Sequence, residues 1–191
     1  MSNKTGKIFV VSSPSGGGKT TLSRALMKCV QKLVRSVSMT TRFPRFGETQ
    51  GRDYFFVTED EFRRTRGRGG FLEEARVFGR RYGTPRRFVE RETRRGRDVL
   101  LLIDVKGAMQ VKKRRPDAVL IFVMPPSLKE LKVRLVGRST EPAREVRERL
   151  DAGRREMRVA ERYDYVVENR EFKKAVAELE AIVTAERLKV K

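Results

Sequence analysis

Short apolar runs alternate with longer amphipathic stretches along most of the chain. Residues 98–103 and 118–124 are almost continuously apolar, which is typical of strands buried on both faces of a parallel sheet. Residues 19–33 and 172–188 instead repeat their apolar positions at helical spacing. Because strands and helices alternate, we expect an α/β fold with helices on both faces of a central parallel sheet.

Shorter segments complete this order. The predicted strands are residues 7–12 and 36–40, and the predicted helices are residues 107–115 and 128–137. Ser127 with Glu130, and Thr58 with Glu61, have the spacing of a capping box, in which two residues satisfy each other's backbone N–H groups at a helix start. We therefore expect helices to begin just after Ser127 and just after Thr58.

Residues 42–84 break the alternation of strands and helices. Glycine occurs there seven times, together with several aromatic residues and many arginines. We predict that this segment forms a subdomain inserted into the core.

The length and the cysteine content bound the class of protein. The chain has 191 residues, the size of one domain or of one domain with an insertion. No apolar stretch approaches the ~20 residues of a membrane span, and the first residues lack a secretory pattern because residues 8–11 already resemble a core strand. The single cysteine, Cys29, precludes an intrachain disulfide and suits a reducing cytoplasm, where we expect the protein to work. It is in line with the apolar face of residues 19–33, so we expect it in the core.

The chain contains no histidine. This excludes Ser-His-Asp and Cys-His nucleophile chemistry and histidine-bound metals, whereas phosphoryl transfer needs only positioning, Mg²⁺ and cationic side chains. The 45 Lys and Arg against 25 Asp and Glu give a net charge of +20, which favours polyanions such as nucleotides and also suits nucleic acid. Few aromatic residues lie between the arginine clusters, so we interpret these clusters as solvated faces rather than as a main nucleic-acid site.

The most informative pattern is a glycine-rich turn directly after a short apolar run. Residues 12–21 read SSPSGGGKTT and follow the apolar residues 8–11. Backbone N–H groups in such a turn form an anion-binding nest, and the helix that follows adds its positive dipole end. Lys19 would reach the β- and γ-phosphates of a nucleotide, and Thr20 would bind Mg²⁺. Ser13 stands where the pattern G-x-x-x-x-G-K-[ST] has its first glycine.

Several longer sequence motifs occur in the same order and with similar spacing as in the guanylate kinase family, so the chain resembles that family. The words that resemble its phosphate-acceptor and guanine-binding segments are SVSMTTRFPR at 36–45, GETQGRDY at 47–54 and FLEEARVFGRRYGT at 71–84. The remaining words are LIDVKG at 102–107, RLVGRS and RERL within 131–150, and YDYVVEN at 163–169. Together with the glycine-rich turn, the resemblance runs from residue 7 to about residue 185.

The resemblance implies an enzyme that transfers the γ-phosphoryl group of ATP to GMP or dGMP, with Mg²⁺, in the recycling of purine nucleotides. The implied catalytic residues are Lys19, Arg42, Arg138 and Arg149. The implied ATP-binding residues are Ser13, Pro14, Ser15, Gly16, Gly17, Gly18, Lys19, Thr20, Thr21 and Asn169, with Thr20 also the metal ligand. The implied GMP-binding residues are Ser38, Arg42, Arg45, Tyr54, Glu73, Tyr82, Thr84 and Asp104.

The chemistry of these side chains agrees with those roles. Arg42 and Arg45 can each fork onto the oxygens of a phosphate. Guanine offers an N1–H and an N2 amino group as donors, which Glu73 and Asp104 could accept, while the Thr84 hydroxyl could donate to O6. Adenine lacks those donors and would leave the carboxylates unpaired, so we expect strong selection against AMP.

The resemblance also implies a domain organisation. A single domain over residues 1–191 would comprise a core at 1–41 and 85–137, a GMP-binding insertion at 42–84, a helical lid at 138–163, and a C-terminal core strand and helix at 164–191. We expect a monomer or a homodimer that binds small-molecule substrates and no membrane.

Three further positions depart from the family pattern. Leu102 stands two positions before Asp104, where an acidic residue is common, so we expect weaker Mg²⁺ binding or slower turnover. Lys106 stands where glutamine is usual, and Arg170 stands where an acidic residue is usual. Both add positive charge near the expected nucleotide sites.

Three other functions stay open on the sequence alone. A non-catalytic module of the guanylate kinase type that binds phosphorylated peptides would generally lack the phosphate loop, which Lys19 and Thr20 argue against. A P-loop kinase for another small phosphorylated acceptor would not need Glu73 and Asp104. An RNA-associated role would appear as salt-dependent binding that survives the change Lys19→Ala.

Overall fold

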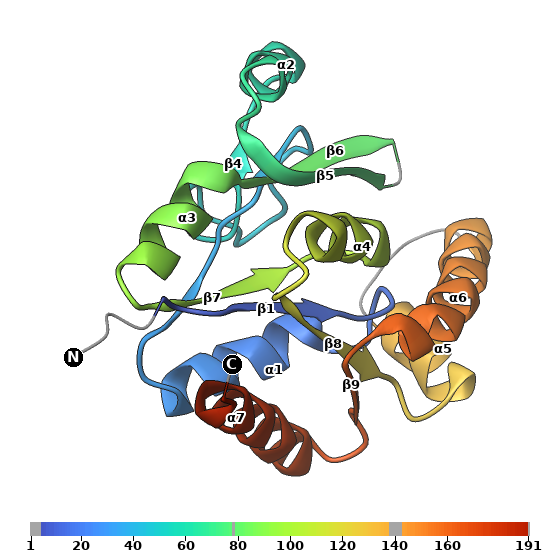
Figure 1. Cartoon of the computed structure of the whole chain (residues 1–191). Helices are drawn as coiled ribbons and strands as arrows, with labels where there is room; N and C mark the ends of the chain where they lie inside the picture. Colours follow the sequence, from blue (N-terminus) through green and yellow to red (C-terminus); the bar gives the residue numbers. More distant parts are fainter. Residues whose placement is uncertain (1–4, 78, 138–142, 191) are drawn as a thin grey trace. The chain divides into compact units, whose positions relative to one another are not determined.

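Five strands form the central sheet of the protein, whose computed structural model describes residues 5–77, 79–137 and 143–190. The strand order is β2-β7-β1-β8-β9 (Figure 1). The strands are β1 (Ile8–Ser12), β2 (Leu33–Arg35), β7 (Asp98–Leu102), β8 (Val119–Met124) and β9 (Tyr165–Glu168). Parallel pairing joins β2 to β7, β1 to β8, and β8 to β9. With helices on both sides of this sheet, the predicted α/β fold is confirmed.

The strands of this sheet are buried because their sequences are apolar on both faces. Every residue of β1 is buried, and so are the first five residues of β8. The predicted strands 98–103 and 118–124 each extend one residue beyond the strand that forms, at the end of β7 and at the start of β8.

A second sheet of four strands forms between residues 39 and 85. Its order is β4-β3-β6-β5, and its strands are β3 (Met39–Thr40), β4 (Phe55–Phe56), β5 (Phe71–Val77) and β6 (Arg80–Pro85). The pair β5–β6 and the pair β3–β6 are antiparallel, while β3 and β4 are parallel. Most of the segment that interrupts the strand–helix alternation therefore has a sheet of its own.

The described helices follow the predicted order. They are α1 (Lys19–Cys29), α2 (Glu59–Gly67), α3 (Arg86–Arg94), α4 (Val105–Arg114), α5 (Leu128–Val136), α6 (Ala143–Arg158) and α7 (Phe172–Leu188), with a short 3₁₀ turn at Val159–Arg162. Thr58 and Glu61 form the full capping box at the start of α2. At the start of α5 the Ser127 hydroxyl accepts a hydrogen bond from the Glu130 N–H at 3.0 Å. Among the described helices, none combines the length and the apolar character that crossing a bilayer requires.

Two predictions about the first helix were wrong. Helix α1 ends at Cys29 rather than at residue 33, because Val30 is extended and Leu33 already belongs to strand β2. Lys32 turns the chain between them with a φ of 60°. Leu33 is buried in the sheet, so its apolar side chain matched helical spacing without being helical. Cys29 is exposed rather than in the core, since it is the last residue of the helix.

The predicted strand at 36–40 was correct only at its end. Strand β2 stops at Arg35, and β3, in the other sheet, contains only Met39 and Thr40. The Ser36 N–H still donates to the carbonyl oxygen of Leu100 at 3.0 Å. The chain therefore leaves one sheet and enters the other within a few residues, which an alternating apolar pattern does not distinguish from one short strand.

The chain divides into two compact units. The first comprises Met1–Ile8, Lys32–Leu101 and Lys106–Ala118, and it contains the whole four-stranded sheet. The second comprises Phe9–Gln31, Leu102–Val105 and Val119–Lys191. Helices α1 and α7 pack against each other in the second unit, as do α5 and α6.

Candidate active site

The glycine-rich turn of the second unit connects the buried end of β1 to helix α1. Gly18 caps the helix with a φ of 95°, and Gly16 has a φ of 86°. Residues with side chains are strained at such angles, so these two positions require glycine. Because Lys32 is the only non-glycine residue with a positive φ in the described part of the chain, Ser13 has an ordinary backbone. A serine therefore fits at the first position of the pattern.

Ser13 is buried and directs its side chain toward Gly17. A Cβ placed on Gly17 would lie 2.9 Å from the Cβ and 3.0 Å from the Oγ of Ser13. The Gly17 N–H donates to the carbonyl oxygen of Pro14 at 2.9 Å, which closes the turn. Ser13 thus occupies the space that a side chain at position 17 would need.

Lys19 and Thr20 begin helix α1. The Lys19 Nζ donates to the carbonyl oxygen of Ile103 at 3.0 Å, at the C-terminal end of β7. Thr20 and Thr21 are exposed. The first N–H groups of a helix have no partner within the helix, so this end of α1 presents donors and a positive dipole to an anion.

Asn169 holds the loop from strand β9. Its side-chain Nδ2 donates to the carbonyl oxygen of Gly17 at 2.9 Å, in a buried position. Its own N–H donates to Met124, and its carbonyl accepts from Arg134 Nη2 at 3.1 Å. A Cβ on Gly18 would lie 2.2 Å from Asn169 Nδ2. Asn169, which the resemblance gives to ATP binding, therefore braces the phosphate loop.

Helix α6 lies close to the same loop. A Cβ on Gly153 would lie 2.9 Å from Leu131 of α5 and 3.5 Å from the Cβ of Pro14. Arg149 is half-buried and stands one helical turn before Gly153, so the two residues share a face of α6. Arg138, the other arginine expected in the lid, lies outside the described residues.

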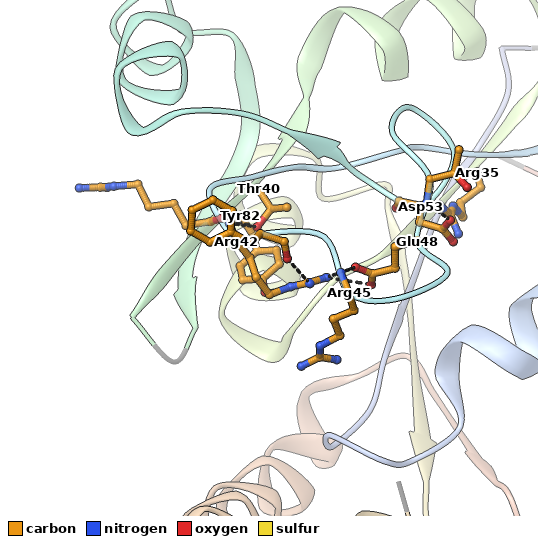
Figure 2. A network of polar contacts seen from close by, with 10 residues as sticks. Arg35, Thr40, Arg42, Arg45, Glu48, Asp53 and Tyr82 are labelled. Atoms are coloured by element: carbon orange, nitrogen blue, oxygen red, sulfur yellow. Dashed lines mark hydrogen bonds and ion pairs between the residues drawn. The ribbon is translucent and has the colours of Figure 1, made fainter. Parts of the chain in front are cut away.

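A cationic cluster in the first unit, referred to below as the cationic pocket, is built around Arg42 and includes several of the residues expected to bind GMP. Arg42 donates from Nε to the Tyr82 hydroxyl at 3.3 Å and from Nη2 to both carboxylate oxygens of Glu48, at 2.8 and 2.9 Å (Figure 2). Its guanidinium also lies over the rings of Tyr54 and Phe56, 5.4 and 5.7 Å from their centroids. The Arg45 side chain is exposed and extends away from this network.

The ionisation of this pocket suits an anion. Burial lowers the pKa of Arg42, but its hydrogen bonds to Glu48 and Tyr82 outweigh that effect and the net change is upward. Burial, followed by the neighbouring Tyr82, raises the pKa of Tyr54. Tyr54 therefore keeps its proton at neutral pH and remains a hydrogen-bond donor.

Glu73 and Thr84 form a buried pair on neighbouring strands. They are opposite each other in the β5–β6 register, and a bulge between Phe71 and Glu73 shifts that register. The Thr84 hydroxyl donates to Glu73 Oε1 at 2.6 Å, and the side chains are exposed by only 0% and 2%, respectively. Ser38, one residue before β3, is also buried in this unit. Bulges of this kind re-aim a side chain, here a carboxylate.

Side chains of helix α4 form hydrogen bonds with the backbone of strand β5 on both sides of Glu73. Gln110 Nε2 donates to the carbonyl oxygen of Glu74 at 2.7 Å, and Gln110 Oε1 accepts from the Glu74 N–H at 3.3 Å. Arg114, one turn later, donates to the carbonyl oxygen of Leu72. Gln110 and Arg114 were not predicted from the sequence. Their four-residue spacing on a predicted helix places them on one face, but it does not identify a partner.

The other candidate positions belong to the second unit, except Lys106, which belongs to the first. Asp104 follows β7, and its carbonyl oxygen accepts a long hydrogen bond of 3.5 Å from the Ser12 hydroxyl. Leu102 is half-buried at the end of β7, and Lys106 is exposed. Arg170 donates to Glu168 at 3.0 Å. Within the described residues, no group of three or more acidic or cysteine side chains could hold a metal ion.

A glycine-rich loop between a buried strand of a parallel sheet and a helix defines a P-loop nucleotide-binding protein. Residues 5–186 match the family model for guanylate kinase. The chain is 45% identical to the guanylate kinase of Syntrophomonas wolfei subsp. wolfei, over 99% of this chain and 97% of that one. It is 46% identical to the guanylate kinase of Wolbachia pipientis wMel, over 96% and 92%. The chain therefore belongs to the guanylate kinase family and is a kinase.

A solved structure supports the same assignment. The crystal structure of guanylate kinase from Anaplasma phagocytophilum superposes with a TM-score of 0.84 at 37% identity, covering 98% of this chain and 89% of that one. Both the fold and the family suggested by the sequence words are thus confirmed.

Proposed function

We propose that the phosphate loop of the second unit binds ATP and that the cationic pocket of the first unit binds GMP or dGMP. As a guanylate kinase, the chain transfers the γ-phosphoryl group of ATP to GMP. The observation that carries the division of roles is the buried Glu73–Thr84 pair, which lies in the same unit as the arginine pocket. A buried acceptor of base donors and a cationic site for a phosphate are the two elements that a guanosine monophosphate requires.

On the donor side, the turn at residues 13–18 supplies backbone N–H groups to the phosphates of ATP. Lys19 exchanges its present bond to the carbonyl oxygen of Ile103 for the β- and γ-phosphates. Thr21 lies in the same first turn of helix α1. Asn169 acts indirectly, because its hydrogen bond to the carbonyl oxygen of Gly17 stabilises the conformation of the loop.

The residues present fit a magnesium ion bound with the nucleotide. Mg²⁺ prefers oxygen ligands and usually keeps several waters, with one or two protein ligands plus substrate phosphates. The exposed Thr20 hydroxyl at the start of α1 supplies one such oxygen beside the phosphate loop. Bound there, the ion would neutralise negative charge on the phosphates of ATP.

On the acceptor side, the phosphate of GMP is bound by five residues of the cationic pocket: Ser38, Arg42, Arg45, Tyr54 and Tyr82. Glu73 and Asp104 are the proposed acceptors for N1–H and the N2 amino group of guanine. The Thr84 hydroxyl donates to Glu73 in this structure, so it would have to turn its proton away from Glu73 to donate to O6. A carboxylate accepts several hydrogen bonds, so Glu73 can accept from guanine as well as from Thr84. AMP lacks those donors and is rejected.

During transfer the arginines stabilise the negative charge of the phosphoryl group. Arg42 and Arg149 are our described candidates, and Arg138 is a third that lies outside the described residues. Arginines in this role contribute roughly 10³–10⁵ in rate. The acceptor is already an anion, so no strong base is required, and closure of lid and insertion would bring donor and acceptor together. We also propose that the enzyme works in the cytoplasm, as a monomer or a homodimer.

A coupled assay of ADP release with ATP and Mg²⁺ tests this scheme across GMP, dGMP, AMP, CMP and UMP. We expect turnover with GMP and dGMP and little with the others. Lys19→Ala should lower kcat by orders of magnitude while calorimetry still detects GMP binding. Turnover with AMP but not GMP would overturn the base assignment, and equal loss of turnover and GMP binding in Lys19→Ala would overturn the separation of the two sites.

A further inference from the structure

We propose that Glu48 is the positioning residue of the acceptor pocket, because one carboxylate fixes both arginines that bind the GMP phosphate. This inference rests on the proposed role of Arg42 and Arg45. Glu48 accepts from Arg42 Nη2 through both oxygens, and its Oε2 also accepts from the backbone N–H of Arg45 at 2.8 Å (Figure 2). The side chain thus contacts the guanidinium of one arginine and the main chain of the other.

The contact to Arg45 closes a turn. The Glu48 N–H donates to the carbonyl oxygen of Arg45 at 3.0 Å, while the Glu48 carboxylate accepts from the Arg45 N–H. Both polar groups of the Arg45 backbone are therefore satisfied by one residue. Because the loop from Arg42 to Glu48 has no helix or strand of its own, this double contact sets where the exposed Arg45 side chain begins.

The contacts of Arg42 leave a defined donor for a substrate. A guanidinium has five N–H groups. Toward described residues, Arg42 uses Nε for Tyr82, one N–H on Nη1 for the carbonyl oxygen of Phe43, and Nη2 for both oxygens of Glu48, so at least one N–H on Nη1 remains. Glu48 therefore does not exhaust Arg42; it turns the remaining N–H and the positive charge to one direction.

The surroundings make this orientation firm. The side chains of Arg42 and Glu48 are only 14% and 21% exposed. The guanidinium is also held over the rings of Tyr54 and Phe56. Partly buried charge pairs are screened less by solvent than exposed ones, and a planar guanidinium held at several atoms loses little further freedom on binding a ligand.

The charge balance favours a positioning role over a blocking one. Glu48 contacts the guanidinium of Arg42 but only the backbone N–H of Arg45, so this carboxylate offsets the charge of Arg42 and leaves that of the Arg45 side chain for the phosphate. If Glu48 instead occupied the place of the phosphate, its removal would strengthen GMP binding. The two roles therefore predict opposite signs for the same substitution.

The test compares Glu48→Gln and Glu48→Asp with the control Asp60→Asn, which removes an exposed carboxylate from helix α2 in the same unit. The apparent KM for GMP and for ATP, kcat, and calorimetric binding of GMP and of guanosine are measured. We expect Glu48→Gln to raise the KM for GMP roughly tenfold or more, with the KM for ATP and the binding of guanosine unchanged. Glu48→Asp, which keeps the charge, should lose less, and Asp60→Asn should resemble the original protein.

Several results would overturn the proposal. They are an unchanged or lower KM for GMP in Glu48→Gln, equal increases in both KM values, or a loss in Glu48→Asp as large as in Glu48→Gln. If Glu48→Gln does not fold by circular dichroism, Glu48→Asp alone must still raise the KM for GMP without changing that for ATP. Failure of the unsubstituted protein to bind GMP would contradict the acceptor pocket itself rather than the role of Glu48.

Discussion

Asn169 reaches back 152 positions to hydrogen-bond the carbonyl oxygen of Gly17, and the same amide nitrogen leaves no room for a side chain on Gly18. The residue that follows strand β9 therefore helps to fix the conformation of the phosphate loop. Arg134 of α5 in turn holds Asn169 by donating a hydrogen bond to its carbonyl oxygen.

Removing the Asn169 amide should weaken ATP binding selectively. We expect Asn169→Ala to raise the KM for ATP several-fold and to lower the free energy of unfolding by about 1–3 kcal/mol, since the buried Gly17 carbonyl loses a partner. The KM for GMP should not change. Steady-state kinetics and urea unfolding check this, with the exposed Lys173→Ala as the control; an equal change in both KM values would contradict it.

A side chain at position 18 should be damaging for two separable reasons. Gly18→Ala combines a φ of 95° with a contact of 2.2 Å to Asn169. Strain at the backbone angle alone costs about 1–2 kcal/mol. The double variant Gly18→Ala with Asn169→Ala removes the contact and keeps the strain, so it should be more stable than the sum of the single effects predicts. Additive losses in thermal unfolding would show that the contact carries no energy.

The carboxylate of Glu73 should set the choice of base. Glu73→Gln replaces one acceptor oxygen with a donor, so kcat/KM for GMP should fall by roughly 10²–10³. Thr84→Val should cost about 1–3 kcal/mol of stability, because a buried carboxylate loses the hydroxyl that donates to it. The coupled assay and denaturant unfolding measure the two effects, and unaltered GMP kinetics in Glu73→Gln would exclude this residue from base recognition.

The grip of helix α4 on strand β5 should matter for GMP rather than for ATP. Gln110→Leu keeps the size of the side chain and removes both hydrogen bonds to the Glu74 backbone. We expect faster amide hydrogen exchange along β5 and a KM for GMP raised about three- to tenfold. Lys113→Ala on the same helix is the comparison. Unchanged exchange at β5 would contradict a role for Gln110 in holding the strand.

Tyr163 should make stability fall at high pH. Its ring packs edge-on to Phe122 at 5.1 Å between centroids, and burial raises the pKa of Tyr163 well above its ordinary value of 10. The folded protein therefore holds the phenolic proton more tightly than the unfolded chain. Its contribution is complete below pH 10 and is lost as the pH rises above that value. Unfolding free energies from pH 8 to pH 11 should decline less in Tyr163→Phe; identical slopes would contradict this.

The fold was accessible from sequence where one physical pattern dominates. Strands β1, β7 and β8 are apolar on both faces, and helix α7 repeats its apolar positions without interruption. These three strands and this helix were therefore predicted with nearly correct ends. The end of α1 was not, because Val30 and Leu33 suit a helix and a strand edge equally well. Lys32, at a positive φ, gives no compositional signal for the turn.

The site divides in the same way. A local sequence motif identifies the phosphate loop, because its glycines, Lys19 and Thr20 are adjacent in the chain. Glu48 lay within a recognised word but had no role until the structure brought it to Arg42. Gln110 was invisible because its partner Glu74 is 36 positions away, and side-chain contacts to a distant backbone leave no spacing to detect.

The contact between Ser13 and Gly17 bears on how the loop can evolve. A Cβ at position 17 would lie 3.1 Å from the carbonyl oxygen of Pro14 and closer still, at 2.9 and 3.0 Å, to two side-chain atoms of Ser13 that a glycine at position 13 would lack. A substitution at position 17 is therefore coupled to position 13, and a smaller residue at position 13 would relieve part of the crowding.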